Sequence, residues 1–286
     1  MDKAFFLNEA HTYINSLFNE FELLKNESKI LLDCFSNICN QENIPYYLGD
    51  GSLLGSIRDG STIPWDPDYD VWVPYNYIEK LLACLATHLP SNYCVITNFN
   101  QKTSFFETKI AKKDCNYGYV HLDIFYLIGT PSTDKKRRAF NALLSKLLFR
   151  RMNCYSFKQQ QKSFPFLLRV VRFLTFFYKY GNLSFKLTNR RLLRLCNKYN
   201  YDKSEYVIRV FHYTALFPKP KESLLVPFMG NNHPVPNNYS EILDIIYKDY
   251  RSYLPIQNRF FEFYNYIFNC PLVSDEIRYD HIDFTN

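Results

Sequence analysis

The sequence predicts an α+β protein in which a small mixed sheet carries attached helices and a basic helical region is added to it. Three observations support this fold class. Short apolar and aromatic runs of strand length alternate with stretches that have helical spacing. Two of the strand-like runs contain carboxylates. Residues 135–201 hold 17 of the 34 Lys and Arg and none of the 28 Asp and Glu, which sets this stretch apart from the rest.

The first half of the chain supplies most of the predicted strands. Apolar residues at helical spacing predict an opening helix over 3–19 and a second helix over 21–41. A strand at 44–48 leads into a glycine turn, after which a short helix ends at Arg58. The remaining elements of this half are an acidic strand at 68–73, a helix at 75–88, and strands at 93–98, 104–111 and 118–127.

The second half begins with the basic tract, which is predicted to be helical to about residue 200. Over 164–180 the cations Arg169, Arg172 and Lys179 share one narrow stripe beside Phe, Leu and Val. Three interpretations compete: a core helix with snorkelling cations, attachment to an anionic membrane surface, and binding of nucleic acid. Nucleic acid is the weakest, because no binding motif accompanies the charge. The tail is rich in Pro, Asn and Tyr, with one helix near 239–250.

Three aspartates, Asp66, Asp68 and Asp70, alternate with other residues at the acidic strand. Side chains two apart lie on the same side of a strand, so these carboxylates form one row. Burying like charges is costly, and a divalent cation removes that cost. The row predicts a site for Mg²⁺, or alternatively Mn²⁺, whereas a solvated acidic turn is the ordinary explanation. An EF-hand is excluded, since Val71 and Tyr77 stand where its glycine and glutamate are required.

The glycine turn ahead of this row has the form of a phosphate-binding loop. Gly51 and Ser52 are followed by apolar residues at helical spacing, so backbone N–H groups at the helix start would face an anion. Arg58, further along the same helix, can add a bidentate phosphate contact. Glycines alone are more often plain turn residues, and their position shortly before the acidic row favours the functional interpretation.

A second acidic position lies in the apolar run YVHLDIFYL, where Asp123 is the one carboxylate. Because aspartate is rarely buried unless it is paired or binds metal, Asp123 is expected to face the same cation or a reacting hydroxyl. An edge strand that exposes Asp123 to water is the alternative. His121 shares the face of Asp123, and we expect it to be a hydrogen-bond partner of the ligands rather than a ligand.

These residues together resemble the LicD/fukutin-related phosphotransferases, a family with a nucleotidyltransferase-like fold. The resemblance is specific over about residues 30–128 and looser over 225–260. The matching motifs are Tyr47-Leu48-Gly49, Gly51-Ser52-Leu53-Leu54-Gly55, Ile57-Arg58, Ile63-Pro64-Trp65-Asp66 with Asp68 and Asp70, and His121-Leu122-Asp123-Ile124-Phe125. Four positions depart from the family pattern: Asp59, Pro67, Tyr126 and Met229. None of them removes a carboxylate from the acidic row or from Asp123.

The resemblance implies transfer of a substituted phosphoryl group, such as phosphocholine or an alditol phosphate, from a CDP-activated donor to a sugar hydroxyl of a cell-surface glycan. On this basis Asp68 and Asp70 bind Mg²⁺ at the donor diphosphate, and Asp123 is a further ligand or the base. Gly51, Ser52 and Arg58 would contact the phosphate oxygens, because phosphoryl transfer requires positioning and charge neutralisation. Asp66 is assigned a flanking role as ligand or support.

Within the resemblance, residues 1–133 form the nucleotidyltransferase-like catalytic core, 134–201 the basic amphipathic region, and 202–286 a segment that completes the domain. Alternative functions are a nucleotidyltransferase, a DxD-type glycosyltransferase that uses a nucleotide-sugar, and an inactive glycan- or lipid-binding module. The glycan acceptor, of the lipopolysaccharide or capsule type, would be lipid-linked if the basic region contacts the membrane.

Composition is consistent with an enzyme of the reducing cytoplasm, peripheral at the inner face of the membrane if the basic region binds there. The eight cysteines are scattered without a C-x-x-C pair, so they predict neither a zinc site nor a disulfide framework. No secretory signal opens the sequence, and no apolar run approaches the length of a spanning helix.

Overall fold

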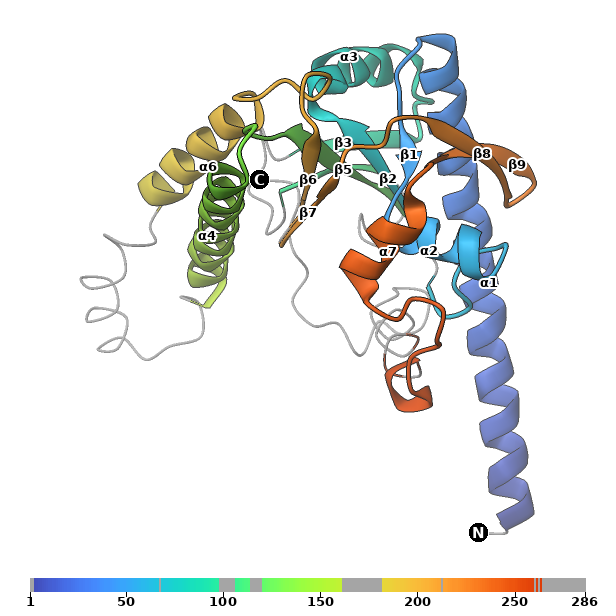
Figure 1. Cartoon of the computed structure of the whole chain (residues 1–286). Coiled ribbons are helices and arrows are strands. Elements are labelled where there is room, and N and C mark those ends of the chain that lie inside the picture. Colours follow the sequence, from blue (N-terminus) through green and yellow to red (C-terminus); the bar gives the residue numbers. More distant parts are fainter. Residues whose placement is uncertain are drawn as a thin grey trace, which may run out of the picture.

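The computed structural model describes residues 3–66, 68–97, 106–113, 120–160, 182–211, 213–259, 261 and 263. Its helices and strands form a curled mixed sheet flanked by helices, which confirms the predicted α+β class (Figure 1). The elements of the first half are α1 (Lys3–Gln41), β1 (Tyr47–Leu48), α2 (Asp50–Arg58), β2 (Tyr69–Pro74), η1 (Tyr75–Tyr77), α3 (Ile78–His88), β3 (Tyr93–Thr97), β4 (Thr108–Lys112) and β5 (His121–Gly129). Those of the second half are α4 (Asp134–Gln160), α6 (Asn182–Cys196), β6 (Tyr206–Val210), β7 (Thr214–Pro218), β8 (Ser223–Phe228), β9 (Asn231–Pro236) and α7 (Tyr239–Tyr247).

The central strand of the sheet is β5, which is buried along its whole length. One of its edges pairs in parallel with β2, whose other edge pairs with β1. Its second edge is shared, because the first half of β5 pairs with β4 and the second half with β6, both antiparallel. Strands β3 and β7 close the two branches of this seven-stranded sheet. Such continuous burial explains why β5 is an unbroken apolar run apart from His121 and Asp123.

A single helix, α1, replaces the two N-terminal helices that the sequence analysis expected. The predicted break around residue 20 is therefore wrong, and its physical reason is that Asn19, Glu20 and Phe21 include neither glycine nor proline. The C-terminal half of α1 buries Leu31, Leu32 and Phe35 in the core. Figure 1 shows the N-terminal end of the helix extending beyond the sheet.

The described part of the basic region consists of α4 and α6, which pack against each other beside β6 and β7 (Figure 1). The two helices bury Phe140, Leu144, Leu148 and Leu192 in the core. Arg151 is also fully buried, with its guanidinium near the rings of Phe106 and Phe185. These helices therefore contribute to the core.

The stripe of Arg169, Arg172 and Lys179 lies outside the described residues, and its membrane role stays a prediction. Among the helices that the structure describes, none combines the length and the apolar character needed to cross a bilayer.

Strands β6 to β9 were not predicted, because the tail had been assigned only one helix. They form two antiparallel hairpins, β6 with β7 and β8 with β9. The segment YVIRV of β6 is short, and its pairing with β5 is a long-range contact that a local pattern does not reveal. The second hairpin, β8–β9, lies beside β1. The predicted helix near 239–250 is present as α7 and lies next to α2 and β7.

Candidate active site

The parallel pair β2 and β5 brings the predicted carboxylates together. Asp70 and Asp123 are direct partners in the register of these strands. Asp68 precedes β2, and His121 begins β5. Because strand side chains alternate, each strand thereby offers two functional groups to the same face of the sheet.

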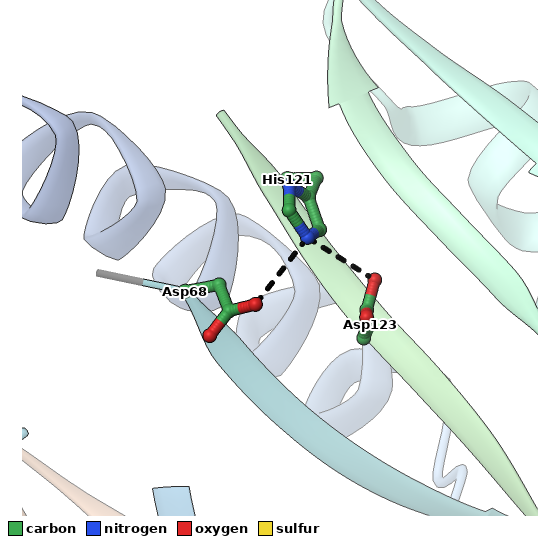
Figure 2. A group of neighbouring side chains, drawn as sticks. All are labelled: Asp68, His121 and Asp123. Atoms are coloured by element: carbon green, nitrogen blue, oxygen red, sulfur yellow. Dashed lines mark ion pairs between the residues drawn. The ribbon is translucent and has the colours of Figure 1, made fainter. Parts of the chain in front are cut away.

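Asp68, His121 and Asp123 form a compact triad (Figure 2). The Nε2 atom of His121 lies 3.5 Å from an oxygen of Asp68 and 3.5 Å from Oδ1 of Asp123. One ligand atom from each residue lies within 4.8 Å of the others. Two carboxylates and one imidazole are ligands that divalent cations accept, so the triad could hold a metal ion. The sequence predicts His121 as a hydrogen-bond partner of the ligands rather than a ligand, and this role stays a prediction; the position of its Nε2 atom also allows it to be a ligand.

Asp70 is buried beside the triad and is tied to the start of α2. Its Oδ2 accepts a hydrogen bond of 2.8 Å from the Gly51 N–H, and its own N–H donates to Oγ of Ser52 at 2.8 Å. Burial, and then the charges of Asp68, Asp50 and Asp123, raise the pKa of the Asp70 carboxyl well above its ordinary value. The protein therefore holds a carboxylate at a position where its charge is disfavoured unless a cation is near.

Glycine at position 51 leaves room for two carboxylates that approach its backbone. A Cβ atom there would lie 2.8 Å from Oδ2 of Asp66 and 3.0 Å from Oδ2 of Asp70. The glycine turn thus lets the start of α2 come close to the acidic row, where the Gly51 N–H donates to Asp70.

A buried ion pair that the sequence analysis missed anchors the same turn. Asp50, the first residue of α2, has a positive φ of 32°. Its Oδ1 lies 2.8 Å from Nη2 of Arg209 on β6, and its Oδ2 accepts a 2.7 Å hydrogen bond from Nε1 of Trp72. The glycine turn is therefore fixed to both β2 and β6. The available signals were a lone arginine within the apolar run of β6 and an aspartate between two glycines.

Lys109 and Glu107 also belong to the site without having been predicted. Nζ of Lys109 lies 2.6 and 2.9 Å from the two carboxylate oxygens of Asp123 and 3.1 Å from Oε1 of Glu107. Glu107 is buried, and burial raises its pKa to about 8 although Lys109 opposes this shift. The sequence signal was an acid and a base two residues apart in a strand-like segment.

Arg58 lies beside the acidic row, where its guanidinium could contact a phosphate group. Its guanidinium pairs with Asp59 at 2.8 Å and lies 4.5 Å from the ring centre of Tyr253. Tyr253 also donates a hydrogen bond to Asp59, and its ring packs edge-on against Trp65. Arg58 is therefore oriented by an acid and by aromatic rings from two distant segments.

The acidic row, the triad, Gly51, Arg58 and Lys109 line one pocket of about 480 Å³. Of the predicted site residues it is lined by Gly51, Arg58, Asp66, Asp68, Asp70, His121 and Asp123. Ser52 is instead buried behind the lining, where it holds the backbone of Asp70. Aromatic side chains form another part of the wall, from β5, the β6–β7 hairpin, the end of α7 and the residues that follow it: Phe125, Phe211, Tyr213, Tyr247 and Tyr250.

A curled mixed sheet with acidic groups on adjacent strands, facing a glycine turn that opens a helix, defines a nucleotidyltransferase-like domain. Residues 43–165 match the family model described as LicD/FKTN/FKRP, nucleotidyltransferase domain. Over these residues the chain is similar to the LicD family. One curated relative, the lipopolysaccharide cholinephosphotransferase LicD of Haemophilus influenzae, is 23% identical over 245 residues, which cover 80% of this chain and 90% of the relative. The family model includes β2, β4 and β5 but ends before Arg209 and Tyr253.

Proposed function

We propose that this protein is a metal-dependent phosphotransferase that moves a substituted phosphoryl group, such as phosphocholine or an alditol phosphate, from a CDP-activated donor to a sugar hydroxyl of a cell-surface glycan. The observation that carries the proposal is the approach of Asp68, His121 and Asp123 within a pocket that also contains the start of α2. The cholinephosphotransferase name of the relative supports the chemical class of the transferred group.

The residues divide into groups that bind the donor and groups that act on the acceptor. Asp68, Asp70 and Asp123, with His121 beside them, fit Mg²⁺ or Mn²⁺, which would neutralise charge on the donor diphosphate. The N–H groups at the start of α2 and the guanidinium of Arg58 would bind phosphate oxygens. Asp66 supports the row from the side of Gly51.

The transfer step follows from these positions. The acceptor oxygen forms a bond to the donor phosphorus while the bond between that phosphorus and the bridging oxygen of CMP breaks. Asp123 would accept the acceptor hydroxyl proton in its role as base, because its carboxylate lines the pocket where that hydroxyl would bind. The aromatic wall limits the water that could compete with the sugar hydroxyl.

CMP release from CDP-choline, CDP-glycerol and CDP-ribitol, measured with a glycan acceptor, tests this function. We expect CMP with one donor, and a loss of about 100-fold or more in Asp68→Asn and Asp123→Asn. Asp134→Asn, on the exposed start of α4, is the matched control and should retain activity. Pyrophosphate release would indicate a nucleotidyltransferase, turnover of a nucleotide-sugar a glycosyltransferase, and tight binding without turnover a binding module.

The acceptor would reach the site at the cytoplasmic membrane face if the basic region binds anionic lipid there. The charge of residues 135–201 supports this location. Flotation with anionic vesicles tests it, and reversing Arg169 and Arg172 to glutamate should release the protein. Association that persists in these variants and in high salt would contradict a basic attachment surface.

A further inference from the structure

Lys109 brings a positive charge into the acidic site from the neighbouring strand. On β4 it is the direct antiparallel partner of Asp123 on β5. Its side chain lines the pocket and is 18% exposed, whereas the carboxyl group of Glu107 behind it is 3% exposed. The ammonium group therefore lies at the pocket between two acids, Asp123 and the buried Glu107.

Lys109 and a metal ion would compete for the same oxygen. Oδ1 of Asp123, which lies 3.5 Å from Nε2 of His121 within the triad, is also the oxygen that Nζ of Lys109 approaches to 2.6 Å. Two cations that share one oxygen repel each other strongly in a partly buried site. Binding of a divalent cation to the triad consequently favours displacement of the ammonium group from Asp123.

The side chain of lysine suits such a displacement. Its ammonium is a compact charge with three donors on a flexible stem, so it can exchange one oxygen partner for another without a planar geometry. Glu107 retains a contact of 3.1 Å with Nζ, which keeps the charge close to the pocket. Phosphate oxygens of a bound donor are the acceptors that such a charge would meet there.

From these contacts we infer that Lys109 is the internal counter-ion of the metal site. It neutralises Asp123 in the metal-free protein, and when the divalent cation binds, it moves to the phosphoryl group of the donor. This inference rests on the proposed function, because it assumes that the triad binds metal. Lys109 then has two opposite effects: it weakens metal binding, and it promotes transfer.

Two measurements separate these effects. Calorimetric titration of the purified protein with Mn²⁺, without donor, measures metal binding, and an assay with donor and acceptor measures transfer. We expect Lys109→Met to bind Mn²⁺ about tenfold more tightly than the wild type, because the competing charge is gone. The same variant should transfer about 100-fold more slowly, mainly through kcat. Lys112→Met is the matched control, since Lys112 lies on the same strand but pairs with Glu27, and it should change neither quantity.

Each outcome decides between the inference and the function on which it rests. Unchanged or weaker Mn²⁺ binding by Lys109→Met, with normal binding by the wild type, would overturn the counter-ion role and leave the metal site standing. Absence of Mn²⁺ binding in the wild type would refute the metal site and the inference together. If Lys109→Met does not fold, Lys109→Gln keeps a hydrogen-bond donor between the two acids, and the same tighter binding is expected.

Discussion

Asp70 and Asp123 face each other as register partners on the parallel strands β2 and β5. Each of them is buried, and the charge of Asp123 contributes to the raised pKa of Asp70. The strand pairing itself therefore brings like charges together. A residue pair that destabilises the metal-free protein is typical of a functional site, because function rather than stability maintains it.

We expect Asp70→Asn to stabilise the metal-free protein and to abolish most of its activity. A raised pKa in the folded state means that ionised Asp70 costs stability at neutral pH, and asparagine removes this cost. The amide oxygen can still accept the hydrogen bond from the Gly51 N–H. Thermal unfolding at pH 7.5 in EDTA should give a higher Tm for the variant. With Mn²⁺ added, the Tm of the wild type should rise more than that of the variant.

An equal or lower Tm of Asp70→Asn in EDTA would show that the charge of Asp70 is already compensated within the protein. Asp134→Asn, which changes an exposed carboxylate on α4, should leave the Tm nearly unchanged in both conditions.

The acidic half of the site was predictable because alternation along a strand is a local property. Asp68 and Asp70 had to share one face, and Asp123 stood out within an apolar run. Pairing of β2 with β5 then makes one site of two segments. The 3.5 Å approach of His121 to Asp68 depends on this pairing, so spacing within either segment did not reveal it.

The basic residues that contact acids of this region, Arg209 and Lys109, were not predictable as site residues, since their positions depend on long-range strand pairing. Arg209 reaches Asp50 because β6 pairs with the second half of β5, and Lys109 reaches Asp123 through the register of β4 with β5. Neither register follows from the local sequence. The missed segments are also those where the apolar pattern is short, as in β6 and β7.

The buried pair of Asp50 and Arg209 should show strong energetic coupling. Arg209→Met leaves the buried carboxylate of Asp50 without its cation, and we expect a loss of about 3–5 kcal/mol in the free energy of unfolding. Asp50→Asn combined with Arg209→Met should lose less than the sum of the single changes, by about 1–3 kcal/mol. Urea-induced unfolding of the wild type and the three variants measures this coupling. Additive losses would indicate that the two residues act independently.

The stacked geometry of Arg58 should matter for binding of the donor. Arg58→Lys keeps the charge but loses the planar contact with Tyr253 and the two-nitrogen contact with Asp59, so the KM for the donor should rise about tenfold. Arg251→Lys is a matched control, because Arg251 also stacks on a tyrosine and pairs with an aspartate but does not line the pocket. Equal KM values for these two variants would contradict a donor contact by Arg58.

Glu107 should make the stability of the protein depend on pH. Its pKa is raised from 4.5 to about 8 in the folded state, so the folded protein holds a proton that the unfolded chain releases. The stability that this proton contributes is complete below about pH 4.5 and is lost as the pH rises to about 8. Glu107→Gln cannot ionise, so this contribution does not change with pH in the variant. The difference in free energy of unfolding between the variant and the wild type should therefore increase in favour of the variant as the pH rises across this range.

Urea-induced unfolding in EDTA at pH 5, 6.5 and 8 measures this difference for the wild type and Glu107→Gln. Glu27→Gln supplies the matched control, because Glu27 on α1 is half-buried and pairs with Lys112, which lies on the same strand as Lys109. We expect the difference between Glu107→Gln and the wild type to grow with each step in pH, whereas Glu27→Gln should follow the wild type. Parallel curves for all three proteins would mean that Glu107 stays ionised over the whole range, with Lys109 outweighing the effect of burial.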